Sequence, residues 1–144
     1  MNALHRIKMV IGASLGTAAI LLAGCAGMMG KNVNVTLSGA EQVPQLKTAA
    51  SGSGSFSVGE DMSVSGSITV SGLAPFAAHI HVGARGENGP VAVGLTKTSD
   101  TVWSVPAGAK FTDAQYQAFV AGKTYVNVHT PAYKGGEIRA QLQP

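Results

Sequence analysis

The stretch SFSVGEDMSVSGSITVSG, Ser55 to Gly72, decides the fold class. Phe56 and Val58 alternate with serines, and the alternation then resumes with Val64, Ile68 and Val70 against Ser and Thr. A period of two residues is typical of a strand with one buried and one exposed face. The stretch therefore predicts two half-buried β-strands separated by a short polar segment.

The same pattern extends in both directions along the chain. Before this stretch, the apolar residues of Val33–Leu37 alternate with Asn, Thr and Ser. Further candidate strands are Ala77–Val82, Val91–Thr96, Thr101–Val105, Thr124–Thr130 and Glu137–Leu142. Short strands with one apolar and one Ser/Thr face, separated by Gly, Pro and Asn, favour an antiparallel sandwich or barrel. The predicted fold class is all-β.

One segment departs from the strand pattern. Thr112 and Gln115 have the spacing of a capping box, and Gly122 suits the C-terminal cap of a helix. The sequence therefore predicts one short crossover helix over Asp113–Ala121. We expect the aromatic residues of this region and Trp103 to belong to the core rather than to a ligand site: Phe111, Tyr116 and Phe119.

The N-terminus has the pattern of an export signal. Arg6 and Lys8 precede an uncharged apolar run from Met9 to Leu22, which is short for a bilayer span. Leu22-Ala23-Gly24-Cys25 resembles the bacterial lipoprotein box, which implies lipidation of Cys25 and sorting to the outer membrane in a Gram-negative cell. The alternative is a short membrane anchor with an incidental cysteine. The expected organisation is a signal peptide over residues 1–24, a lipidated tether over 25–32 and one domain over 33–144.

The charge balance argues against a nucleic-acid partner. Removal of the signal takes Arg6 and Lys8 and leaves eight basic against seven acidic side chains, with no basic cluster. Cys25 is the only cysteine, so the mature domain can form no internal disulfide. We therefore expect an exported domain that is stabilised by burial, with or without a metal.

The histidines of the mature chain lie in two candidate strands. In AHIHVG, His79 and His81 share one face, opposite Ile80. In TYVNVH, His129 shares a face with Asn127 and lies opposite two valines. If these strands are neighbours, three imidazoles converge on the outer face of the sheet, where they could bind Cu(II) or Zn(II).

The alternative to a metal site is a structural polar cluster, in which the imidazoles hydrogen-bond loop carbonyls or Asn127 and Tyr125. The sequence leaves both readings open. In a metal site, Glu137 and Asp100 are candidates to orient an imidazole N–H.

Four segments together resemble the signature blocks of the CHRD domain, a family named after chordin. They are LSGAEQVP (37–44), GSITVSGL (66–73), AHIHVGARGENGPV (78–91) and GKTYVNVHTPAYKGGEIRAQL (122–142). The resemblance spans residues 33–143 and implies an immunoglobulin-like β-sandwich or barrel with no established reaction. It marks Glu41, Pro44, His79, His81, Gly83, Asn127, His129, Gly135, Gly136, Glu137 and Arg139 as characteristic positions.

The last strand and the turn before it include several of these positions. Gly135-Gly136 predicts a turn into Glu137–Leu142. Glu137 and Arg139 share the polar face of that strand, and we expect them to form a solvated pair rather than a site.

A weaker resemblance links HIHVG to the strand that supplies two copper ligands in copper/zinc superoxide dismutases. The mature chain lacks the additional histidines and the disulfide of that family. It also contains no GxSxG, P-loop or CxxC motif, and its carboxylates show no paired spacing.

Three hypotheses follow from these features. The first is a non-enzymatic, lipid-anchored module of the cell envelope that presents loops to a protein, a glycan or a small ligand. The second is a copper- or zinc-binding protein that uses His79, His81 and His129. The third is a superoxide dismutase-like enzyme.

Overall fold

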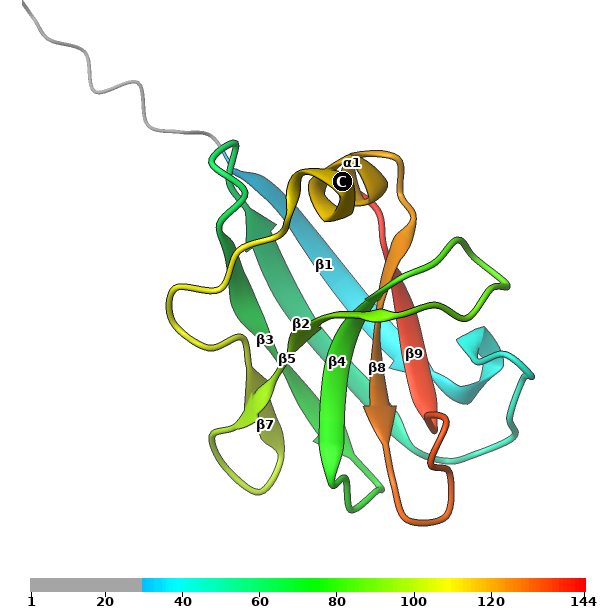
Figure 1. Cartoon of the computed structure of the whole chain (residues 1–144). Coiled ribbons are helices and arrows are strands. Elements are labelled where there is room, and N and C mark those ends of the chain that lie inside the picture. The colour runs from blue at the N-terminus through cyan, green and yellow to red at the C-terminus, as the bar shows by residue number, and fades with distance from the viewer. Residues whose placement is uncertain (1–29) are drawn as a thin grey trace, which may run out of the picture.

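A computed structural model describes residues 30–144 as one antiparallel sheet wrapped into a nearly closed barrel (Figure 1). The strands are β1 (Lys31–Ser38), β2 (Ser51–Val58), β3 (Val64–Ser71), β4 (Ala77–Val82), β5 (Val91–Gly94), β6 (Thr96–Lys97), β7 (Val102–Ser104), β8 (Thr124–His129) and β9 (Ile138–Leu142). A 3₁₀ turn, η1 (Gly39–Glu41), follows β1, and one helix, α1 (Asp113–Val120), precedes β8. The all-β prediction is confirmed. The predicted signal peptide and Cys25 lie outside the described residues.

The strand order explains how the barrel closes. The sheet runs β5-β4-β8-β9-β1-β2-β3-β7-β6, so β5 and β6 form its two edges. Only Leu95 separates these two strands in the chain, and its N–H donates to the carbonyl of Ala78 in β4. One continuous segment therefore connects both edges of the sheet.

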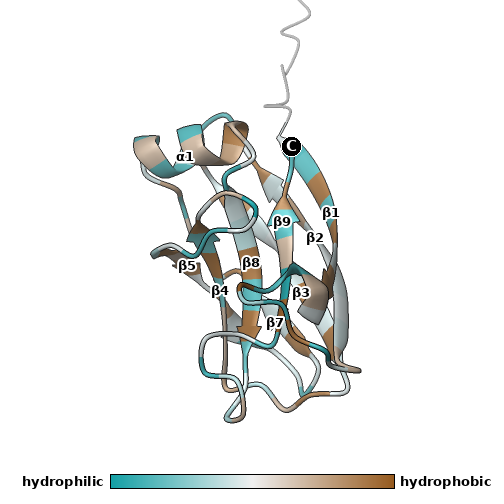
Figure 2. Cartoon of the chain, turned by 90° about the vertical axis from the view of Figure 1, so that its right-hand side faces the viewer, coloured by the Kyte–Doolittle hydropathy of each residue, from teal (hydrophilic) through white to brown (hydrophobic). Residues whose placement is uncertain are grey.

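Strands β1, β2 and β3 carry a polar outer face without a charged side chain. Their registers pair Asn34 with Ser55 and Ser55 with Ser67, and the rows on either side repeat the pattern. From Asn32 to Ser71, every outward position of these three strands is Ser, Thr or Asn. Figure 2 shows the bands of hydrophobic and hydrophilic residues along β1 that this alternation produces.

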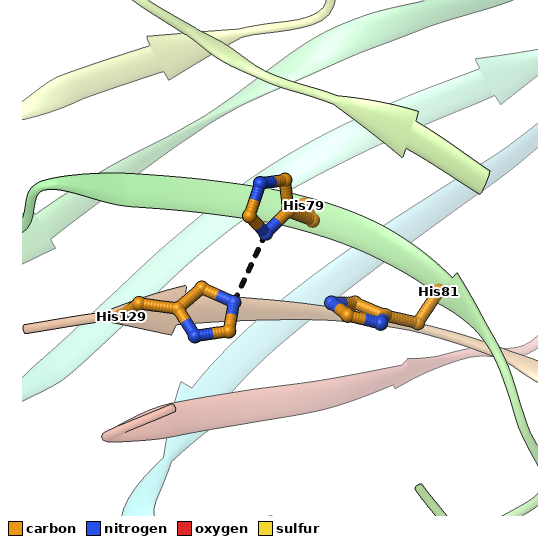
Figure 3. A group of neighbouring side chains, drawn as sticks. All are labelled: His79, His81 and His129. Atoms are coloured by element: carbon orange, nitrogen blue, oxygen red, sulfur yellow. Dashed lines mark hydrogen bonds between the residues drawn. The ribbon is translucent and has the colours of Figure 1, made fainter. Parts of the chain in front are cut away.

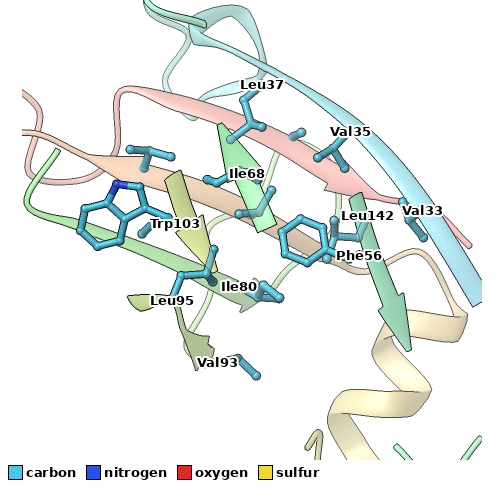
Figure 4. Packing of buried hydrophobic residues seen from close by; sticks show 14 of the residues in the cluster. Val33, Val35, Leu37, Phe56, Ile68, Ile80, Val93, Leu95, Trp103 and Leu142 are labelled. Carbon is cyan, nitrogen blue, oxygen red and sulfur yellow. The ribbon is translucent and has the colours of Figure 1, made fainter. Parts of the chain in front are cut away.

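The inward residues form one core (Figure 4). Its most deeply buried members include Leu37, Phe56, Ile68, Ile80, Phe119, Val126, Val128, Ile138 and Leu142. Of the predicted core aromatics, Trp103, Phe111 and Phe119 are buried, whereas Tyr116 is partly buried against the core. The rings of Phe111 and Phe119 lie 6.0 Å apart. The burial of so much apolar surface is the main stabilising term of the fold.

The predicted helix is present over Asp113–Val120. Its capping box forms as expected, because the Thr112 side chain accepts from the Gln115 N–H and the Gln115 side chain accepts from the Thr112 N–H. Gly122 adopts a positive φ of 69° just after the helix, as its predicted capping role requires.

Strand β2 is longer than the sequence predicts, because it begins at Ser51 rather than Ser55. Gly52 and Gly54 occupy its inward positions, so no apolar residue marks the first half of the strand. A Cβ on Gly54 would lie 2.1 Å from the carbonyl oxygen of Ser67, so glycine is needed there for close packing of the backbones.

Candidate metal centre

The pairing of β4 with β8 brings the three histidines together. The strands are antiparallel neighbours, with His79 opposite Asn127, His81 opposite Tyr125 and Ala77 opposite His129. One nitrogen from each imidazole lies within 4.8 Å of the others. His79 Nδ1 and His129 Nε2 are 3.0 Å apart, and the dashed line in Figure 3 marks this contact. The predicted convergence of His79, His81 and His129 is therefore present.

The imidazoles lie on the face opposite the barrel core, as predicted, but the solvent exposure expected of that face is wrong for two of them. His81 and His129 are each only 8% exposed, and His79 is half-buried. The β4–β5 loop and the β8–β9 loop contact the imidazoles: the Gly89 carbonyl oxygen lies 2.9 Å from His81 Nδ1, and that of Lys134 lies 2.8 Å from His129 Nδ1. Strand β8 is consequently buried on both faces, with Val126 and Val128 in the barrel core.

These two carbonyl contacts fix the imidazole tautomers. A carbonyl oxygen only accepts, so Nδ1 of His81 and of His129 carries the proton, and Nε2 of each neutral ring keeps a free lone pair. His79 Nδ1–H then donates to His129 Nε2. His81 Nε2 is buried and has no hydrogen-bond partner within the described part of the chain. Lone pairs of two buried rings thus face the shared space.

The spacing of one pair of nitrogens, from His79 and His129, suits a metal ion. Two nitrogens at about 2.0–2.1 Å from one ion lie about 2.9 Å apart at a right angle and about 3.3 Å apart at a tetrahedral angle. The 3.0 Å separation of His79 Nδ1 and His129 Nε2 falls within that range. Loss of the shared proton would therefore free both nitrogens for one ion with little movement of the strands.

The surroundings favour neutral imidazoles, which are the metal-binding form. Burial lowers the pKa of His79, and the neighbouring His129 and His81 lower that pKa further. Burial also lowers the pKa of His81, although the hydrogen bond to the Gly89 carbonyl acts in the opposite direction. Neutral nitrogen ligands are therefore available near neutral pH.

Glu137 and Arg139 do not form the solvated pair that the sequence predicts. Glu137 is 8% exposed, and its two oxygens accept from the Thr48 and Thr130 hydroxyls at 2.7 Å each. Arg139 is 1% exposed, and its guanidinium lies 3.4 Å above the centre of the Tyr125 ring. This polar face is covered by the β4–β5 loop, the β8–β9 loop and the segment before β2. The side chains that the sequence pattern predicts to be exposed therefore form a second interior, which is polar.

Neither carboxylate proposed to orient an imidazole does so. The Glu137 carboxylate accepts hydrogen bonds from two threonine hydroxyls. Asp100 is fully exposed and forms an ion pair with Lys97. Backbone carbonyls of the covering loops take that role instead. No periodic pattern in the sequence marks these loop residues.

Tyr125 and Arg139 form a stack beside the histidines that sequence reasoning missed. The Tyr125 ring lies parallel to His81, with centroids 4.9 Å apart and 5° between the planes. Its hydroxyl accepts from the Gly89 N–H, and Gly89 in turn accepts from His81. A Cβ at Gly83 would lie 2.9 Å from the Tyr125 ring, so the characteristic glycine leaves room for the stack.

The remaining characteristic positions support the covering loops. Asn127 Nδ2 donates to the Gly135 carbonyl, and the predicted turn at Gly135-Gly136 is present, with a φ of 120° at Gly136. Glu41 forms an ion pair with Arg85 on the β4–β5 loop. Glu41, Arg85 and Pro44 line a surface cavity of about 340 Å³. The three histidines do not line this cavity.

Comparison with known proteins agrees with these observations. The model of the CHRD domain family matches residues 33–142, nearly the whole described part of the chain. No curated protein and no solved structure matches the sequence. With the match covering this barrel and all three of its histidines, the chain belongs to the CHRD domain family.

Proposed function

We propose that this CHRD domain is a metal-binding module that holds copper or zinc through His79, His81 and His129. One observation carries the proposal: three imidazole nitrogens converge within 4.8 Å, and one of them, His81 Nε2, is buried without a partner among residues 30–144. Imidazole is a common ligand of both metals, and three nitrogens form a sufficient protein ligand set for either.

The unpartnered nitrogen favours a metal over a purely structural cluster. A structural cluster gains stability only when each buried polar atom is hydrogen-bonded, and an unsatisfied one costs about 1–3 kcal/mol. His81 Nδ1 and His129 Nδ1 follow this rule with loop carbonyls, whereas His81 Nε2 and, on the same face, Asn127 Oδ1 do not. A bound ion would use the lone pair of His81 Nε2.

We further propose that the domain acts at the cell envelope as a non-enzymatic module, exported and anchored through lipid on Cys25. The support is the signal-like N-terminus and the lipoprotein-like box at Leu22–Cys25. In the described residues, no helix is long and apolar enough to cross a membrane.

A thermal-shift experiment on the purified full chain in detergent tests the metal proposal. Cu(II) or Zn(II) at a hundredfold excess over its dissociation constant should stabilise the folded protein by about 2.7 kcal/mol, because the unfolded chain does not hold the ligands together. Each single His→Ala change at positions 79, 81 and 129 should remove most of the metal-induced shift. An Asp100→Ala control, on an exposed carboxylate, should keep it.

The shift is read as metal-loaded minus metal-free melting temperature, so loss of stability in a variant does not affect the comparison. An equal shift in the wild type and in the triple alanine variant would contradict the proposal. In that case the imidazoles would be structural hydrogen-bonding groups.

A further inference from the structure

We propose that the three-histidine site selects monovalent copper over divalent ions, and that Arg139 is the residue that determines this preference. The inference rests on the proposed metal-binding function and names the ion that the site takes. It follows from the charges in and around the cluster rather than from the number of its ligands.

The ligands themselves bring no negative charge. Within residues 30–144, the cluster consists of three histidines, without a carboxylate or a thiolate. A divalent ion therefore keeps a net charge of two in a site where two of the three ligands are only 8% exposed. Since the desolvation cost of an ion rises with the square of its charge, burial penalises a divalent ion far more than a monovalent one.

Arg139 adds a permanent positive charge to the same environment. Its guanidinium donates to uncharged acceptors, namely the carbonyl oxygens of Ala84 and Glu87 and the side-chain oxygens of Asn88 and Gln141. The ion pairs found between residues 30 and 144 do not include it. Arg139 is thus a buried cation whose hydrogen bonds are made without a counter-charge.

The stack places this cation close to the ligands. Arg139 reaches the Tyr125 ring from β9, whereas His81 reaches it from β4, on the other side of β8. The guanidinium lies 3.4 Å from the centre of the Tyr125 ring and the His81 ring centre lies 4.9 Å from it, so the positive charge of Arg139 repels any positive charge held at His81. The same repulsion would act on a bound ion, in proportion to the charge of that ion.

Among residues 30–144, no carboxylate is hydrogen-bonded to an imidazole of the cluster or to Arg139. Glu137 is the single buried acid in the described chain, and both of its oxygens bind threonine hydroxyls. Glu41 pairs with the exposed Arg85. At an effective dielectric constant of about 20 and roughly 8 Å along the stack, Coulomb's law makes the repulsion of a divalent ion twice that of a monovalent ion, a difference that lowers the relative affinity for the divalent ion at least tenfold.

Competition titrations on the full chain in detergent test the inference. Cu(I) affinity is measured without oxygen against bicinchoninate, and Cu(II) and Zn(II) affinities against chelators of known strength. The wild type should bind Cu(I) more tightly than either divalent ion. Arg139→Gln, which removes the charge, should raise the affinity for Cu(II) and Zn(II) at least tenfold relative to Cu(I), whereas Arg139→Lys, which keeps it, should leave the ratio near the wild-type value.

The reduction potential of the bound copper gives a second readout. A tenfold change in the ratio of Cu(II) to Cu(I) affinities corresponds to 59 mV for one electron, so the potential of Arg139→Gln should fall by at least that amount. If Arg139→Gln does not fold, Gln141→Glu supplies a negative charge to the intact arginine and should change the ratio in the same direction.

The outcomes separate the two proposals. Absence of binding by all three ions would overturn the metal-binding function and this inference with it. Binding that favours Zn(II) or Cu(II) in the wild type, or an affinity ratio that is the same in Arg139→Gln and Arg139→Lys, would overturn the inference alone.

Discussion

Two backbone carbonyl groups decide which nitrogen each buried histidine presents to the shared space. Gly89 and Lys134 belong to the β4–β5 and β8–β9 loops, and each accepts from an imidazole Nδ1. Their positions depend on other single residues: Tyr125 accepts from the Gly89 N–H, and Asn127 donates to Gly135, next to Lys134. The imidazoles of His81 and His129 are therefore orientated by loop backbone that β8 side chains hold in place.

Acid should destabilise the metal-free protein through two of these histidines. The folded-state pKa values of His79 and His81 lie below the ordinary value, with burial as the leading cause for both. The unfolded chain therefore binds protons first, and the free energy of unfolding should fall as the pH drops below about 6.5. Urea titrations at pH 7.5 and pH 5.5 should show a loss in the wild type that is smaller in a His79→Gln, His81→Gln variant. Equal losses in the two proteins would contradict the predicted origin of the effect.

Among the strands, β8 and its neighbour β9 are alike in that every one of their residues is buried. One face of β8, with Val126 and Val128, belongs to the barrel core. The other face, with Tyr125, Asn127 and His129, lies under the loops that connect the strands. The strand therefore separates an apolar interior from a polar one.

Truncation of the apolar face of β8 should cost stability. Val126 is fully buried, so Val126→Ala should lower the free energy of unfolding by about 1–3 kcal/mol through lost burial and the cavity left behind. Val91→Ala offers a matched control, since Val91 is 51% exposed on the edge strand β5 and should change stability by less than about 0.5 kcal/mol. Urea unfolding measures both variants. Similar costs at the two positions would contradict the assignment of the core face.

The sequence pattern predicts some strands and not others. Strand β4 was predictable because apolar and polar residues alternate without interruption from Ala78 to Val82. The start of β2 was not, because Gly52 and Gly54 leave its inward face without side chains. The burial of His81 and Arg139 was missed because irregular loops cover them, and a period of two residues identifies a face but not what lies over it.

At the scale of the whole molecule, barrel closure protects the sheet edges. The segment through Leu95 joins β5 to β6, so both edges belong to one continuous piece of chain. Open edges are the usual route by which β-proteins pair with one another and aggregate, and closure shortens them. The domain can therefore be stable without the disulfide that its cysteine content excludes.

The proposed lipid anchor on Cys25 leads to a prediction about the location of this barrel. Lipid attachment needs the Cys25 thiol, so Cys25→Ser should prevent acylation and leave the protein unprocessed or released from the membrane. Membrane fractionation and mass spectrometry of the N-terminus measure this outcome. A Cys25→Ser protein that is still acylated at its mature N-terminus would contradict the lipoprotein assignment.

The uncharged outer face of β1, β2 and β3 has a consequence for engineering. A two-residue shift in the pairing of these strands would exchange one small polar outward side chain for another. The inward-facing residues must therefore determine the register. There, Phe56 lies opposite Gly66, and a Cβ on Gly66 would lie 2.7 Å from the Phe56 Cα atom. The outer face is thus a regular lattice of interchangeable sites, on which a designer could display a peptide epitope or a chosen pattern of charges while the barrel beneath retains its alignment.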